Sequence, residues 1–172
     1  FIKNVNHARE AGFPHQGQVL GINIGKNTTT SVGDALADYI FCMRKVYKQA
    51  SYVAVNISSP NSPGLRDLQK ESELATLIEG LKQEHEALKE KFGKHVPLVV
   101  KIAPDMDDED MTNLARRLLS FELDGVIVSN TTVSRGAVAG ERHASQSGGL
   151  SGAPLRSQAN HALSLVSNEV KG

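Results

Sequence analysis

Five polar side chains of this sequence lie at or just after the ends of short apolar runs, and their types suit the binding of a small polar ligand. Asn23, Asn56 and Asn130 offer carboxamides, which both donate and accept hydrogen bonds. Lys101 offers a cation, and Ser59 adds a hydroxyl group shortly after Asn56. A cation among carboxamides and a hydroxyl predicts a site for a polar ligand with an anionic group, either a cofactor or a substrate.

The loop NISSPNSPGL, residues 56–65, directly follows the apolar run YVAV. Because proline restricts the residue before it to extended geometry, Pro60 and Pro63 are expected to give the loop a fixed course and to orient Ser59 and Asn61. Serine, asparagine, proline and glycine are also ordinary turn residues, so a plain loop is the alternative. Rigidity around a hydroxyl flanked by carboxamides favours a binding loop.

Lys101 lies inside the run LVVKIAPD. A lysine in a buried strand costs free energy unless its charge meets a partner, so we expect it to face an anion. The alternative is a side chain that extends its ammonium group to solvent from the end of the strand. Lys26 is expected in solvent and Cys42 in the core, and neither is assigned chemistry.

Two further segments carry groups that suit a ligand. The run DGVIV leads into Ser129, Asn130 and Thr131, and SGGLSGAPL, which includes Gly152, follows later in the chain. Glycines permit close approach of the backbone, and a helix start offers free N–H groups to a phosphate. Ordinary capping and loop roles are the alternative for either segment taken alone.

The elements that must position these residues can be predicted from periodicity. Four apolar runs rich in valine and isoleucine predict strands buried on both faces, as in a parallel sheet; they begin at Val19, Tyr52, Pro97 and Asp124. Helical spacing of apolar residues predicts four helices, around residues 36–47, 74–88, 105–118 and 155–166. The third begins with DMDDEDM, whose negative charge suits a helix N-terminus.

This alternation of strand and helix fits two α/β architectures, a doubly wound open sheet or part of a (β/α)8 TIM barrel. An open sheet concentrates ligand contacts at one switch point, whereas a barrel brings the C-terminal end of every strand to one mouth. Because polar residues end every run, we predict a barrel. A full barrel needs about 250 residues, so residues 1–172 are expected to form roughly half of a single domain.

Composition excludes several classes of protein. The 19 basic and 19 acidic side chains give a net charge of zero, so the overall charge does not indicate binding to a nucleic acid or an anionic membrane surface. One cysteine excludes an intramolecular disulfide framework, and six histidines without ligand-like spacing predict no metal site. No apolar run approaches the roughly 18 residues that span a bilayer.

Taken together, five segments resemble the quinone-dependent class 2 family of dihydroorotate dehydrogenases, in that family's order: GINIGKN, VNISSPNSPGLRDLQ, VVKIAPD, DGVIVSNTTVSR and GGLSGAPL. The resemblance covers nearly the whole chain. Ser59 favours class 2, because cytosolic class 1 relatives carry cysteine at that position. The resemblance implies a (β/α)8 barrel that binds FMN and oxidises dihydroorotate to orotate in pyrimidine synthesis.

The same resemblance implies roles for individual residues. Ser59 is the base that takes the C5 proton while hydride leaves C6 for the flavin. Serine is a poor base, so it must pass its own proton to neighbouring hydroxyls or water. The implied substrate contacts are Asn61, Asn130 and Thr131, and the implied FMN contacts are Asn23, Asn56, Lys101, Ser129 and Gly152.

The resemblance also implies partners outside this sequence. Electrons pass from the reduced flavin to ubiquinone or menaquinone, and no nucleic acid takes part. The chain is expected to be the central fragment of its parent, with both barrel ends and an N-terminal membrane-associating segment outside it. We therefore expect peripheral attachment to a membrane, either the cytoplasmic side of a bacterial inner membrane or the mitochondrial inner membrane.

Two other functions stay open at this point. A buried lysine at a strand end also suits a flavin-free barrel aldolase, in which Lys101 forms a Schiff base with a carbonyl substrate. The 172 residues are also compatible with an inactive half-barrel that associates through its unpaired strand edges.

Overall fold

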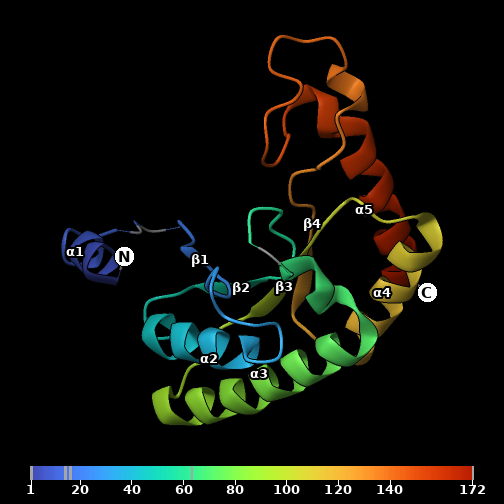
Figure 1. The fold of residues 1–172 in the computed structure, drawn as a ribbon. Helices are drawn as coiled ribbons and strands as arrows, with labels where there is room; N and C mark the ends of the chain where they lie inside the picture. Colours follow the sequence, from blue (N-terminus) through green and yellow to red (C-terminus); the bar gives the residue numbers. More distant parts are fainter. Residues whose placement is uncertain (1, 14, 16, 63, 172) are drawn as a thin grey trace.

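The computed structural model describes residues 2–13, 15, 17–62 and 64–171. Its centre is a sheet of four parallel strands in the order β1-β2-β3-β4, so that each strand is hydrogen-bonded to the next one along the chain (Figure 1). The strands are β1 Gly21–Ile24, β2 Tyr52–Asn56, β3 Leu98–Ile102 and β4 Gly125–Val128. Each lies within one of the four predicted runs. Pro63, which was expected to stiffen the loop after β2, lies outside the described residues.

Helices follow the strands as the periodicity predicted. They are α2 Ala35–Val46, α3 Glu71–Phe92, α4 Asp108–Ser120 and α5 Arg156–Lys171, with α1 Ile2–Glu10 before the first strand. Short 3₁₀ turns occur at η1 Leu65–Gln69, η2 Gly136–Val138 and η3 Ala153–Leu155. Helix α1 was not predicted, and its residues include no fully buried side chain from which a periodic apolar stripe could be recognised.

The N-terminus of α4 shows how its acidic sequence acts. Asp107 is the N-cap, and its side chain accepts a hydrogen bond of 2.8 Å from the backbone N–H of Asp110. Three acidic residues follow in the first turn, where the helix dipole favours negative charge. The helix buries four apolar residues that recur at helical spacing: Met111, Leu114, Ala115 and Leu118.

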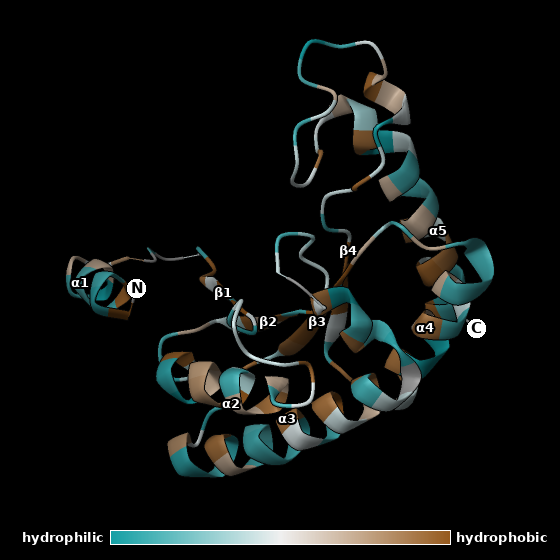
Figure 2. Ribbon diagram, viewed as in Figure 1, coloured by the Kyte–Doolittle hydropathy of each residue, from teal (hydrophilic) through white to brown (hydrophobic). Residues whose placement is uncertain are grey.

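The prediction that the strands are buried on both faces was wrong for three of them. Burial alternates along β1 and β3, and every residue of β4 is only half-buried, whereas β2 buries three consecutive residues. The reason is that α2, α3 and α4 lie on one side of the sheet (Figure 1). Figure 2 shows the hydrophobic residues on the strands and on parts of the packed helices, with a largely hydrophilic outer surface on α3. Two of the apolar residues behind the helix predicted around 155–166 have opposite outcomes: Val166 of α5 is buried, whereas Leu163 is 49% exposed, and Ala162 is buried beside Val166.

Sequential strand order and helices on one face identify the architecture. A doubly wound sheet has helices on both faces and a reversal of strand order, neither of which the described sheet shows. An arc of a (β/α)8 barrel has both observed features, with strands as the inner layer and helices as the outer layer. The fold is therefore a partial TIM barrel. No helix of the described residues is both long and apolar enough to cross a membrane.

Candidate active site at the strand ends

The sheet register brings three predicted residues to one face of the sheet. Asn56 pairs with Lys101, and Asn23 pairs with Ala54, which lies two residues before Asn56. Since side chains alternate along a strand, Asn23, Asn56 and Lys101 project from the same face. Their neighbours Ile24 and Ile102 are buried, so the polar face is the one turned away from the packed helices.

Asn56, Ser58 and Asn130 form a hydrogen-bonded cluster at the C-terminal ends of β2 and β4. Asn56 Oδ1 accepts bonds from the Ser58 N–H at 3.1 Å and from the Ser58 hydroxyl at 3.0 Å. Asn130 Nδ2 lies 3.0 Å from Ser58 Oγ and 3.4 Å from Asn56 Oδ1. Tyr39 donates its phenol to the Asn56 carbonyl at 2.6 Å, and burial raises the pKa of this phenol, so it stays protonated at neutral pH. The bonds among the three side chains fix the directions of both carboxamides, whereas the Tyr39 bond holds the backbone of Asn56.

The Ser59 loop and the glycine loop approach this cluster. Ser59 is half-buried, and its Oγ accepts a hydrogen bond of 3.3 Å from the Asn61 N–H. A Cβ built on Gly149 would lie 1.9 Å from Thr131 Oγ1, so only glycine permits this approach. A Cβ on Gly148 would lie 3.7 Å from Asn61 Oδ1. The loops after β2 and β4 therefore meet over the strand ends.

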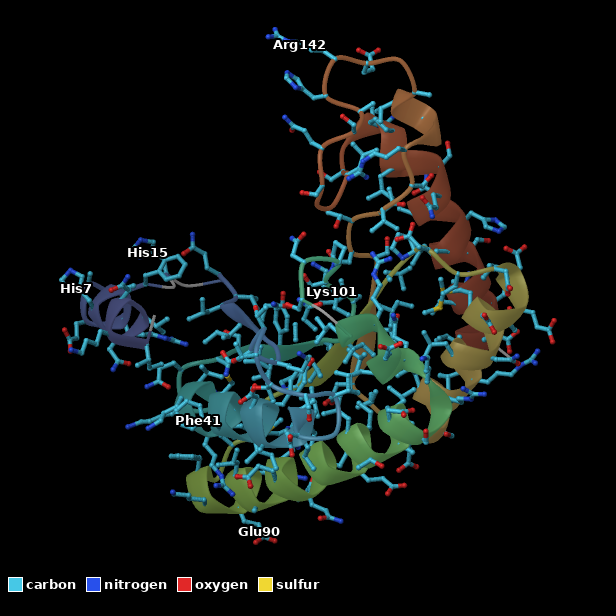
Figure 3. The ribbon with its side chains drawn as sticks, in the orientation of Figure 1. His7, His15, Phe41, Glu90, Lys101 and Arg142 are labelled. Atoms are coloured by element: carbon cyan, nitrogen blue, oxygen red, sulfur yellow. The ribbon has the colours of Figure 1, made fainter. Side chains whose placement is uncertain are left out.

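Lys101 is half-buried, and its ammonium group has no hydrogen bond or ion pair among the residues that the structure describes. It lies centrally, between the strands and the loops that follow them, whereas Phe41 and Glu90 lie on the outer helices (Figure 3).

Lys26, unlike Lys101, has partners for its ammonium group, and the prediction that it lies in solvent was wrong. It is only 6% exposed, because its ammonium group donates to the carbonyls of Asn27 at 3.0 Å and Thr30 at 2.7 Å.

The remaining predicted residues lie nearby but outside the cluster. Ser129 immediately precedes Asn130 and donates its hydroxyl to the Asn130 carbonyl at 3.0 Å. Gly152 has a φ of +80° and precedes the turn η3, which leads into α5. Within the described part of the chain, no hydrogen bond joins the Asn23 side chain or Gly152 to the cluster.

Sequence reasoning missed the charged pair beneath these loops, Arg66 and Asp105. Arg66 NH1 lies 2.8 Å from Asp105 Oδ2, and the two side chains are 26% and 13% exposed. Asp105 also accepts bonds from the hydroxyl of Thr132, from the Val133 N–H at 3.2 Å and from Gln158 Nε2 at 3.2 Å. The sequence does show an arginine and an aspartate that follow the ends of two predicted strands. Their contact could not be predicted, because no local pattern links two residues so far apart in the chain.

These contacts control the charge of Asp105. Burial alone raises the pKa of its carboxyl group, but the hydrogen bonds from Thr132, Val133 and Gln158 and the positive charge of Arg66 outweigh burial. The pKa of Asp105 is therefore lower than its ordinary value. The carboxylate form, which holds the pair together, is the stable form at neutral pH.

We expect Asp105→Asn to lower the free energy of unfolding by about 1–3 kcal/mol at neutral pH, because the variant leaves a mostly buried guanidinium without its anion. A carboxyl group whose pKa is lowered by folding stabilises the folded state fully at pH values above its pKa in the unfolded chain, about 3.9. This stabilisation is lost as the pH falls through the pKa of the folded state. The difference between parent and variant should therefore shrink in acid, as measured by chemical denaturation across this pH range.

Asp67→Asn is the matched control, since Asp67 forms an exposed pair with Lys70. Its effect at neutral pH is expected below about 1 kcal/mol. Equal losses in the two variants, or a loss in Asp105→Asn that does not change in acid, would contradict the assignment of the stabilisation to the Asp105 carboxylate.

The convergence of polar residues on the C-terminal ends of parallel strands is the arrangement of a (β/α)8 barrel enzyme at its active-site end. A family model described as dihydroorotate dehydrogenase matches residues 2–172, and the chain belongs to that family. This confirms the resemblance that the motifs carried.

Relatives and solved structures agree with this family. A protein of Azotobacter vinelandii named dihydroorotate dehydrogenase (quinone) is 52% identical over 171 residues, and one of Pseudoalteromonas atlantica with the same name is 49% identical over 171 residues. A crystal structure of DHODH from Eimeria tenella in complex with ferulenol superposes with a TM-score of 0.88 at 33% identity. Each comparison covers 99% of this chain but only 48%, 49% and 48% of the other, so the chain spans about half the length of these proteins.

Proposed function

We propose that this chain is the central part of a single FMN-binding (β/α)8 barrel domain that oxidises dihydroorotate to orotate and passes the electrons to a membrane quinone. The observation that carries the proposal is the convergence at one end of the sheet of the Ser59 loop, the carboxamide cluster and the Lys101 ammonium group, which has no partner among the described residues. The names of the relatives support the quinone as acceptor. We also propose that attachment to the membrane is peripheral, through a segment outside residues 1–172.

The residues at the strand ends fit a flavin. Among the described residues, the Lys101 ammonium group and the Asn56 Nδ2 donor have no protein partner, although neither side chain is fully exposed. Both lie on the open face, beside each other in the sheet register. We propose that Asn23, Asn56, Lys101, Ser129 and Gly152 hold FMN there. Bound FMN supplies the acceptor for the hydride that leaves C6 of the substrate.

The residues of the chain itself would bind the substrate and remove its proton. We propose that Asn61, Asn130 and Thr131 bind the pyrimidine edge and orient its C5–H bond toward Ser59. Because Ser59 Oγ is the acceptor in its bond with the Asn61 N–H, its own hydroxyl hydrogen is available to another acceptor. As Ser59 takes the C5 proton, its hydroxyl proton would pass to water or a neighbouring hydroxyl.

The test measures the flavin absorbance of the full-length protein that contains this chain, and the response of that absorbance to dihydroorotate and to a quinone. We expect it to purify with bound FMN and to lose the flavin absorbance when dihydroorotate is added without oxygen. Adding a quinone should then restore the absorbance. A colourless protein that borohydride links to a carbonyl substrate through Lys101 would instead support the aldolase, and a flavoprotein that dihydroorotate does not reduce would refute the proposed substrate.

A further inference from the structure

Arg66 connects the loops that follow three different strands. It belongs to η1, after β2, and its Nε donates to the Ser58 carbonyl at 3.3 Å. Its NH2 group donates to the Thr131 carbonyl, after β4, at 3.3 Å. Its NH1 group forms the ion pair with Asp105, after β3, at 2.8 Å. One planar guanidinium group thus uses all three of its nitrogens on three separate segments, a geometry that lysine cannot reproduce.

Asp105 holds the guanidinium in this position. Its two oxygens accept from Thr132, Val133 and Gln158 as well as from Arg66. Gln158 lies on α5, so the carboxylate is also tied to the helix behind β4. A carboxylate with this many donors is fixed in direction and fixes its partner in turn.

Gln69 gives the same turn a second anchor. It is 8% exposed, and its Oε1 accepts a bond of 3.1 Å from the N–H of Ala103, the first residue after β3. Its Nε2 lies 3.4 Å from the Arg66 carbonyl. The turn η1 is therefore held against β3 at one point, and Arg66 extends from it to β4.

The positions that Arg66 contacts adjoin the proposed catalytic groups. Ser58 immediately precedes Ser59, and Thr131 immediately follows Asn130. Ser59 carries the proposed base, whereas Asn130 and Thr131 bind the proposed substrate. Arg66 contacts the segments of both through their backbone carbonyls, so it can set their separation without touching the substrate.

We propose that Arg66, held by Asp105, is a positioning residue that sets the distance between the Ser59 hydroxyl and the substrate bound at Asn130 and Thr131. The inference rests on the proposed function and assigns a further residue to the same site. A misplacement of about 1 Å between reacting groups can cost about 10²-fold in rate. Loss of Arg66 should therefore slow proton removal more than it weakens ligand binding.

The experiment compares Arg66→Met and Arg66→Lys with the parent, all as the full-length FMN-bound protein. Arg44→Met is the matched control, since Arg44 forms a two-point ion pair with Glu84 on the outer helices. The first measurement is hydrogen exchange of the backbone amides of residues 57–62 and 129–133 without substrate. The second is the rate constant for flavin reduction by dihydroorotate without oxygen, together with the dissociation constant of orotate and the FMN content.

We expect Arg66→Met to speed exchange in both segments and to lower the reduction rate constant about 10- to 100-fold, with FMN content retained and the orotate dissociation constant changed less than about 3-fold. Arg66→Lys should keep the charge pair but not the bonds to both carbonyls, so its rate should fall less than that of Arg66→Met. Arg44→Met should leave all four measurements as in the parent.

A parent-like rate and parent-like exchange in Arg66→Met would overturn the inference, as would equal losses in rate and orotate affinity. If Arg66→Met does not fold, Arg66→Lys decides by the same measurements. Failure of dihydroorotate to reduce the parent protein would refute the proposed function instead. The exchange measurement would then still test whether Arg66 holds the two segments.

Discussion

Replacing Ser59 with alanine is expected to lower the rate of flavin reduction by dihydroorotate about 10²- to 10⁴-fold, the range that a positioned general base contributes. The change removes the only hydroxyl proposed to take the C5 proton. It is expected to leave the Asn56–Ser58–Asn130 cluster intact, because within the described part of the chain the Ser59 side chain makes no hydrogen bond to that cluster. FMN should therefore stay bound, and orotate should still bind.

Stopped-flow absorbance of the full-length protein without oxygen measures this effect. Ser72→Ala is a suitable control, since Ser72 is exposed at the start of α3 and bonds its neighbour Glu73. Its reduction rate should equal that of the parent. Near-normal reduction in Ser59→Ala would remove Ser59 from the proposed role, and loss of FMN from that variant would point to a structural function of the loop.

The second large effect is expected from Lys101→Met. The side chain keeps a similar length, but the cation on the open face of the sheet is lost. A preplaced charge stabilises the negative charge that develops when the flavin accepts hydride, and removal of one such group typically costs about 10²- to 10³-fold in rate. We expect a loss of this size in the reduction rate, together with weaker FMN binding.

FMN titration monitored by flavin fluorescence and stopped-flow reduction measure the two consequences separately. Lys82→Met is the control. Lys82 is also a partly buried lysine, but its ammonium group donates to the Phe121 carbonyl at 2.6 Å on the far side of the sheet. Lys82→Met should bind FMN with the affinity of the parent, and dihydroorotate should reduce its flavin at the rate of the parent. Unchanged FMN affinity and reduction in Lys101→Met would show that its ammonium group faces no flavin.

Much of the fold could be predicted from the sequence because its signals are local. The spacing of Leu74, Leu77 and Ile78 is set by one turn of helix, so the apolar stripe of α3 is visible in the sequence and is buried in the structure. The strand-end asparagines were recognisable for a similar reason, since each lies at or just after the end of an apolar run. Parallel pairing then brings Asn23, Asn56 and Lys101 to one face.

The features that were missed depend on contacts between distant segments. Lys26 is buried because two backbone carbonyls of its own loop accept hydrogen bonds from its ammonium group. The positions of these carbonyls depend on the path of the backbone. Arg66 and Asp105 meet only when the loops after β2 and β3 pack together. The open face of the strands was also unforeseen, since apolar composition alone does not show on which side the helices lie. Long-range geometry of this kind is set by packing rather than by the local sequence.

The most direct measurement is a crystal structure of the full-length protein with FMN and orotate bound. It should show Ser59 Oγ within about 3–3.5 Å of orotate C5, the near-attack distance for reacting atoms. Asn61 and Asn130 should contact the pyrimidine, and Lys101 should contact the flavin. Orotate bound away from the strand ends, or a Ser59 hydroxyl directed away from C5, would contradict a single active site built from these residues.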